Sequence, residues 1–430
     1  MVTKSTISIV GAAAMLVVAS FAAGKGNADA PYVPHDELIL RRSIVEGGNA
    51  FALDLYGRLA FGEEGNLFFS PASIHTALSM TYAGAAGKTA EQMAEVLRLP
   101  PGEAAHRVYG EILGDLNTPK KVRAWARDVD KPISVPAYEL VVANALWGQD
   151  GYPFKAAFTQ LVEKHYGAGL SSVDYVQAAE AARTTINDWV EKQTQGRIKD
   201  LIPPGVLNAM TRLVLTNAIY FKSQWAEQFS ERATKDGDFR LGDGKSVKVP
   251  MMRQQEKFGY LETDAFQALE MPYKAGELSM VVLLPKAVDG LAAFEKGLTA
   301  DKLAGWMGGL KRREVKVTLP KWKMTSQFGL ADMLKKMGMT DAFAPGTADF
   351  SGMTTAEKLF ISAVIHKAFF EVDEEGTEAA AATAVAIAAT AMPPQPAEPK
   401  VFKADHPFLY LIRHRPTDLV LFMGRVANPK

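Results

Sequence analysis

The chain of 430 residues contains no cysteine, which excludes disulfide bonds, thiol nucleophiles and cysteine-ligated metal sites. It also lacks the G-x-S-x-G motif of serine hydrolases and the H-E-x-x-H motif of zinc peptidases, and its seven histidines do not have ligand spacing. Lysine plus arginine and aspartate plus glutamate number 48 each, so there is no basic bias for nucleic acid. The sequence therefore predicts neither an enzyme nor a nucleic-acid-binding protein, and no metal or other cofactor.

The N-terminus is typical of an exported protein. Lys4 precedes an apolar run over residues 7–23, and residues 28–30 have the A-x-A form of a signal-peptidase site. Pro31 weakens that site, so cleavage nearer Ala23 is an alternative. An uncleaved membrane anchor is a second alternative, although the run is slightly short for a spanning helix.

We therefore expect a signal peptide over residues 1–30 and one domain over residues 31–430. The protein would be secreted to the extracellular space, or to the periplasm of a bacterium. The sequence has no N-x-S/T glycosylation signal, which fits export from a bacterium at least as well as eukaryotic secretion. Hydrophobic residues make up 48% of the chain, enough for a large core without disulfides.

Periodicity and turn residues predict helices early in the chain and strands late, without repeats, as in a single α+β body. Helices are expected over residues 53–61, 71–82, 90–99, 104–116, 158–166, 178–195, 291–306 and 328–336. Strands are expected over residues 138–147, 171–175, 210–221, 249–260, 315–322 and 359–372. Residues 118–136 are polar, basic and interrupted by proline, and are expected to form a solvated loop.

Residues 372–394 carry contradictory signals. Their alanines favour helix, whereas Thr383, Val385 and Ile387 favour strand and share one face of it. Gly376 interrupts the start, and two prolines close the segment. Composition alone would favour an alanine-rich linker or a surface helix, but the mixture of strand and loop character also indicates a segment with two states.

The sequence EEGTEAAAAT, residues 374–383, resembles the hinge of the reactive-centre loop of serpins, the serine protease inhibitor superfamily. The resemblance extends from about residue 49 to residue 429 through NLFFSPASI at 66–74, LTNAIYFKSQW at 215–225 and FMGRVANP at 422–429. It implies a secreted member of the family. The absence of glycosylation signals is compatible with a bacterial member. The implied fold is a single α+β domain with three β-sheets, eight or nine helices and an exposed reactive-centre loop at about 374–400.

The resemblance also implies a mechanism, in which a target serine protease cleaves the loop and is trapped as an acyl-enzyme while the loop inserts into the main sheet. A cysteine protease is a further target to consider. The inhibitor would be a monomer that can polymerise by loop insertion. The alternative is a non-inhibitory serpin acting as carrier, chaperone or structural protein; such members commonly have bulky or charged hinge residues, which this chain lacks. Residues 118–136 correspond to a region that binds heparin-like polyanions in some serpins.

Site residues follow from the matched motifs. The hinge would comprise Glu374, Gly376, Thr377, Glu378, Ala379, Ala380, Ala381, Ala382 and Thr383. The reactive bond would join Thr390 to Ala391, with Ala389 and Met392 as rival positions, because the loop is several residues longer than usual. Proline after Met392 disfavours cleavage there. These small, uncharged residues imply elastase-like or subtilisin-like targets.

Two further groups of residues match the family's control points. Ser70, Ser73, Asn217 and His366 match the shutter, a hydrogen-bonded cluster where the sheet parts. Trp225, Lys321 and Glu374 match the breach at the top of the sheet. On sequence alone the lysine–glutamate pair could equally be a weak surface contact.

Overall fold

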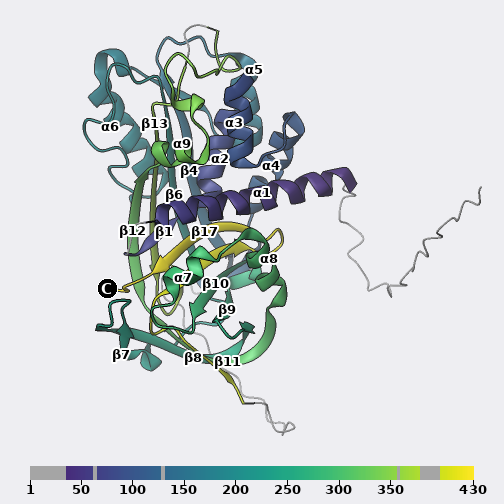
Figure 1. Cartoon of the computed structure of the whole chain (residues 1–430), viewed down its shortest axis with the longest axis vertical. Helices are drawn as coiled ribbons and strands as arrows, with labels where there is room; N and C mark the ends of the chain where they lie inside the picture. Colours follow the sequence, from purple (N-terminus) through teal and green to yellow (C-terminus); the bar gives the residue numbers. More distant parts are fainter. Residues whose placement is uncertain (1–34, 62–64, 127–130, 356–358, 378–397) are drawn as a thin grey trace, which may run out of the picture.

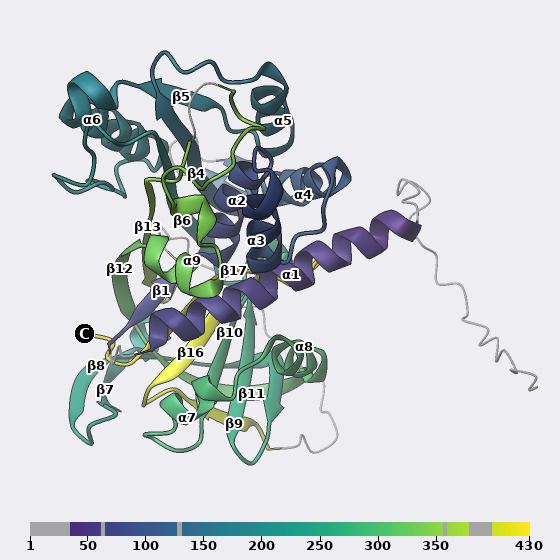
Figure 2. The same cartoon turned by 45° about the horizontal axis from the view of Figure 1, so that its top comes forward.

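The computed structural model describes residues 35–61, 65–126, 131–355, 359–377 and 398–430. These residues form nine α-helices and three β-sheets, which confirms the expected α+β class (Figure 1). Helix α1 (His35–Ala60) crosses the middle of the molecule, and most of the early helices gather on one side of it (Figures 1 and 2). The expected signal peptide lies outside the described residues. No helix within the described ranges is long and apolar enough to cross a membrane.

The observed helices match the expected ones more closely in number and order than in length. Helix α1 begins at His35, far ahead of the expected start, and the expected helix over 291–306 is two helices. The remaining helices are α2 (Pro71–Tyr82), α3 (Gly87–Leu97), α4 (Glu103–Leu116), α5 (Ala156–Tyr166), α6 (Tyr175–Gln193), α7 (Leu291–Lys296), α8 (Ala300–Gly309) and α9 (Ala331–Met337), with short 3-10 turns η1 (Glu231–Ala233), η2 (Lys274–Gly276) and η3 (Asp341–Phe343).

The largest sheet has nine strands and contains most of the C-terminal half. Its order is β1-β17-β16-β10-β9-β8-β11-β15, with β7 paired to β8. The strands are β1 (Leu67–Phe69), β7 (Lys235–Arg240), β8 (Ser246–Glu262), β9 (Phe266–Pro272), β10 (Leu278–Pro285), β11 (Lys311–Pro320), β15 (Lys400–Lys403), β16 (Phe408–His414) and β17 (Leu419–Val426).

The second sheet has six strands in the order β12-β13-β14-β6-β4-β5 and carries the candidate site. Its strands are β4 (Tyr138–Gln149), β5 (Leu170–Val173), β6 (Leu213–Gln224), β12 (Trp322–Gly329), β13 (Ala363–Val372) and β14 (Gly376–Thr377). The apolar runs in β4 and β6 predict central, buried strands, and both pair along their length in the interior. The expected helix over 328–336 is wrong at its start, because Phe328 continues β12 in register with His366.

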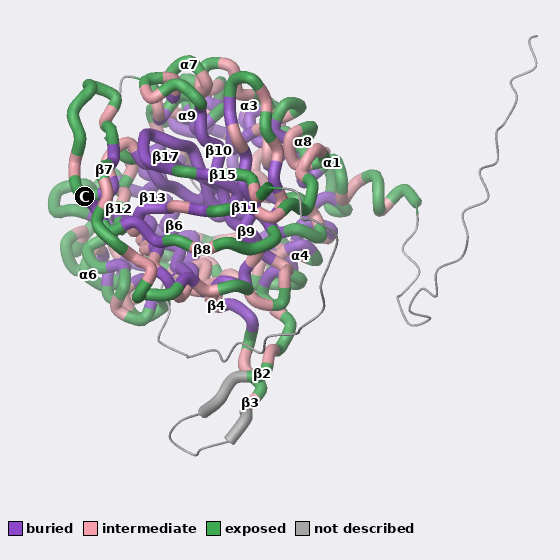
Figure 3. Tube along the Cα trace, turned by 90° about the horizontal axis from the view of Figure 1, so that it is seen from below, coloured by how far each residue is buried: buried purple, intermediate pink, exposed green. Residues whose placement is uncertain are grey.

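The third sheet corrects the solvated loop expected over 118–136. Strands β2 (Lys121–Ala126) and β3 (Lys131–Pro136) form an antiparallel hairpin that projects from the body (Figure 3). Val122 lies opposite Val135; Val122 stands between Lys121 and Arg123, and Ser134 separates Val135 from Ile133. This period of two favours strand pairing over a loop despite the basic composition.

Candidate functional site

Strand β14 enters the six-stranded sheet from one end. Thr377 pairs with Val372 of β13 on one side and with Ser223 of β6 on the other. Its side chain is fully buried, and its hydroxyl lies 2.7 Å from that of Tyr273. Further along, β13 and β6 pair directly with each other. The first residues of the candidate hinge therefore already occupy the position of a new central strand.

Gly376 is required here by the close approach of the neighbouring strand. A Cβ at this position would lie 2.1 Å from the carbonyl oxygen of Ser223 and 2.7 Å from the Cα of Gln224. Both contacts are with backbone, which cannot move aside cheaply. The resemblance assigned this glycine to the hinge, and these contacts give a steric reason for glycine at this position.

A tight turn at Asp373 brings β14 back alongside β13. Its carboxylate accepts hydrogen bonds from the backbone N–H of Glu375 at 2.9 Å and of Gly376 at 3.1 Å. Its own N–H donates to the carbonyl of Gly376 at 3.0 Å. Burial raises the pKa of Asp373, although these two donors oppose the shift. Sequence reasoning missed this residue; an aspartate three positions before a glycine is the signal of such a turn.

The breach residues are brought together around this turn. Lys321 Nζ lies 2.8 Å from Glu374, whose side chain is 8% exposed, and Thr234 donates a 2.7 Å hydrogen bond to the same carboxylate. Burial alone would raise the pKa of Glu374, but Lys321 and Thr234 lower it below its usual value. The pair is therefore partly buried and hydrogen-bonded, unlike the weak surface contact that the sequence left open.

Trp225 fixes the turn from the side of β6. Its indole Nε1 donates to the carbonyl of Asp373 at 3.0 Å, and its backbone N–H donates to that of Glu375 at 2.9 Å. Its ring stacks on Tyr273 with centroids 4.6 Å apart. Because Tyr273 also contacts Thr377, one aromatic pair supports both the turn and the hinge strand.

The shutter residues form one buried network beneath the β13–β6 junction. Ser70 caps α2 by accepting a hydrogen bond from the N–H of Ser73, and its hydroxyl donates to the carbonyl of Leu421 at 2.7 Å. Asn217 donates to the hydroxyl of Ser73 at 2.6 Å and contacts His366. All four predicted side chains therefore lie together.

Asn144 is a member of this network that sequence reasoning missed. It accepts a hydrogen bond from the hydroxyl of Ser73 at 3.0 Å and donates one to the carbonyl of the same residue, also at 3.0 Å. It also accepts from the amide of Asn217. The signal was present, since Asn144 is the only amide within the apolar run of β4.

His366 is neutral and held in one tautomer. Burial lowers its pKa from 6.5 to about 3. Its Nε2 accepts from the backbone N–H of Ser70 at 3.1 Å, so Nδ1 carries the proton and donates to the side-chain oxygen of Asn217. Protonation would place a second donor against the Ser70 N–H and break this contact.

Several predicted residues lie outside the described residues. They are Glu378, Ala379, Ala380, Ala381, Ala382 and Thr383 of the hinge, and Ala389, Thr390, Ala391 and Met392 around the reactive bond.

Comparison with known proteins agrees with this geometry. A family model described as Serpin (serine protease inhibitor) matches residues 46–429. The chain is 42% identical to a leukocyte elastase inhibitor of Equus caballus, over 88% of this chain and 97% of that protein. It is 43% identical to an uncharacterized serpin-like protein of Thermococcus kodakarensis, over 90% and 86% respectively. A crystal structure of uncleaved ovalbumin superposes with a TM-score of 0.78 and 31% identity, covering 90% of this chain and all of that one.

Proposed function

Because the chain belongs to the serpin (serine protease inhibitor) family, which is not a family of enzymes, and is similar to a leukocyte elastase inhibitor, we propose that it is a suicide-substrate inhibitor of elastase-like or subtilisin-like serine proteases. The protease cleaves the reactive-centre loop and becomes acylated by it. The freed loop then inserts between β13 and β6 and carries the attached protease with it. Distortion of the protease before deacylation makes the complex permanent.

The observation that carries this proposal is the position of β14 between its two neighbours. Thr377 is antiparallel to β6 at Ser223 and antiparallel to β13 at Val372. An antiparallel pairing, once started, assigns a partner to every later residue. The partners of the remaining loop residues on β6 and β13 can therefore be found by counting residues from Thr377.

Counting six residues onward from Thr377 sets Thr383 opposite both Asn217 and His366. Ile387 comes opposite Leu213, where β6 begins. The inserted strand would thus run over the shutter and end with the sheet. The candidate reactive positions 389–391 follow soon after Ile387. Cleavage there would release all the residues that are counted into the inserted strand.

The side chains of the loop suit the space they would enter. Thr377 points inward, so residues of the same parity would do so too, namely Ala379, Ala381, Thr383, Val385 and Ile387. The leading positions are small and meet little steric resistance. Burial of Val385 and Ile387 contributes roughly 1.5–3 kcal/mol each, and each new ladder hydrogen bond adds about 1 kcal/mol. The total is comparable to the ~5–15 kcal/mol that holds a protease folded.

Incubation with elastase and with subtilisin tests the proposal, with SDS gels to detect a stable complex. Mass spectrometry of the released peptide fixes the cleaved bond, expected between Thr390 and Ala391. A clean cleavage product without complex would instead support a non-inhibitory carrier, chaperone or structural role. The same assay with a papain-like protease tests cysteine proteases as secondary targets.

Export is a separate part of the proposal and is supported by the signal-like residues 1–30. N-terminal sequencing of the protein from culture medium or periplasm should find a start near residue 31, or near residue 24 for the alternative site. Retention of Met1 in a cell-associated protein would contradict this part alone.

A further inference from the structure

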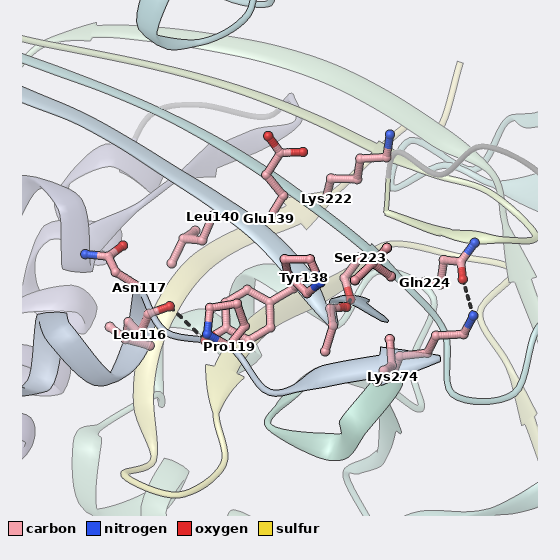
Figure 4. A pocket seen from close by; sticks show the side chains of 14 residues that line it. Leu116, Asn117, Pro119, Tyr138, Glu139, Leu140, Lys222, Ser223, Gln224 and Lys274 are labelled. Carbon is pink, nitrogen blue, oxygen red and sulfur yellow. Dashed lines mark hydrogen bonds between the residues drawn. The ribbon is translucent and has the colours of Figure 1, made fainter. Parts of the chain in front are cut away.

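A cavity of about 580 Å³ opens at the base of the β2–β3 hairpin (Figure 4). It lies between the C-terminal end of α4, the first residues of β4 and the last residues of β6. The lining is largely apolar, and includes Leu116, Pro119, Val122, Val135, Tyr138 and Leu140. Its volume and its apolar walls are typical of sites for small organic molecules.

The walls are held in place by contacts within the protein. The N–H of Lys120 donates to the carboxylate of Glu277 at 2.8 Å, which ties the start of the hairpin to the turn before β10. The N–H of Ala137 donates to the carbonyl of Lys120 at 2.8 Å and closes the hairpin base. The hydroxyl of Tyr138 donates to the carbonyl of Leu116 at 2.8 Å, so this side chain forms a fixed floor. A ligand would therefore enter a preformed site.

The charges around the cavity favour an anion. Lys274 reaches toward β6 along one side, where its ammonium group hydrogen-bonds the side-chain oxygen of Gln224 (Figure 4). Lys222 and Glu139 lie side by side on the opposite face of the two strands from Tyr138 (Figure 4). Glu139 is the only carboxylate among the described residues of the lining, and it accepts a hydrogen bond from Gln195. Among the described residues of the lining, two lysines accompany one carboxylate, and Glu139 lies beside Lys222. The carboxylate of Glu277 at the hairpin base is paired with Lys120, so Lys274 carries the unbalanced positive charge.

We propose that this cavity binds a small amphipathic organic anion, with its apolar body against the hairpin valines and Leu140 and its carboxylate or sulfonate at Lys274. A neutral ligand would leave the ammonium group without a counter-charge. Because Ser223 and Gln224 line the cavity and pair with Thr377 and Gly376, the bound anion would lie one strand away from the hinge. The proposal rests on the cavity and its charges, and it stands whether or not the protein traps proteases.

The test is a fluorescence titration of the full-length protein with 1-anilinonaphthalene-8-sulfonate, an anion with an aromatic body. Competition with decanoate and with decan-1-ol, which share an alkyl chain, isolates the contribution of charge. Decanoate should displace the probe at least about tenfold more effectively than the alcohol, since a tenfold ratio corresponds to ~1.4 kcal/mol for one partly buried charge contact.

Lys274→Gln should weaken probe binding at least tenfold, whereas Lys257→Gln, at an exposed position of β8, should leave it unchanged. Val135→Asp places a carboxylate in the wall and should also weaken probe binding, with circular dichroism to confirm that the variant is folded. Equal displacement by alcohol and acid, or unchanged binding in Lys274→Gln, would overturn the proposal. Because the readout is direct binding, this result is independent of the complex assay with elastase.

Discussion

Replacing Thr377 by arginine should turn the inhibitor into a substrate, because the side chain at this position must be buried for the loop to enter the sheet. Thr377 is fully buried, and its hydroxyl meets that of Tyr273 at 2.7 Å. An unpaired guanidinium buried here would cost several kcal/mol. The two residues of β14 gain about 1 kcal/mol for each backbone hydrogen bond to β13 and β6, a few kcal/mol in all. The cost of burying the guanidinium is therefore comparable to the free energy gained when β14 pairs, which is enough to keep the hinge outside the sheet.

Thr377→Val is the matched control, because it keeps the shape and removes only the hydroxyl. It leaves the hydroxyl of Tyr273 without this partner, at a cost of about 1–3 kcal/mol, and should still permit insertion. The assay is the stoichiometry of inhibition of elastase, with gels that separate complex from cleaved product. Mainly cleaved product is expected from the arginine variant and mainly complex from the valine variant. An arginine variant with undiminished complex yield would refute the insertion reasoning.

Three further changes probe the breach, the shutter and the loop register. Glu374→Gln removes the charge that faces Lys321 in a partly buried, hydrogen-bonded pair, and it should lower the free energy of unfolding measured by urea titration by about 1.5–3 kcal/mol. His366 has a folded-state pKa of about 3 against 6.5 when unfolded, so its stabilising contribution is complete above pH 6.5 and is lost as the pH falls toward 3. Between pH 7 and pH 5, the free energy of unfolding of the wild type should therefore fall by roughly 2 kcal/mol more than that of His366→Gln, as measured by urea titration. Thr383→Glu should lower complex yield with elastase because it would bury a carboxylate between Asn217 and His366, whereas Thr383→Val should not; equal yields would show that the counted register is wrong.

The sequence was sufficient to group most of the shutter and breach residues because they belong to long, distinctive blocks of sequence. Ser70 and Ser73 stand in one such block and Asn217 and Trp225 in another. Each block also fixes a local structure, a capped helix in the first case and a buried strand in the second. Once these strands and helices form, few arrangements of a six-stranded sheet can accommodate them, so the relative positions of their side chains are limited.

Other features depend on contacts that no single segment encodes. The entry of β14 requires the turn at Asp373, the indole of Trp225 and the close approach of Ser223, which come from three distant stretches. Asn144 joins the shutter only because β4 pairs in register with β6. The β2–β3 hairpin was misread because its composition suggested solvent exposure, and its alternation of residues was the better guide.

The strand that follows the loop gives a reason why the proposed insertion would need cleavage. If the uncut loop inserted as far as Ile387, the twelve residues 388–399 would have to return from the far end of the sheet to Lys400. Ten residues of inserted strand are about 33 Å long, while twelve fully extended residues span at most ~43 Å. The return path would use about three quarters of the maximum span of this segment, and its tension would act on β15, which is held to β11 by only four residue pairs. In the proposed mechanism, cutting the loop would remove this tension, so insertion could proceed while β15 stays paired.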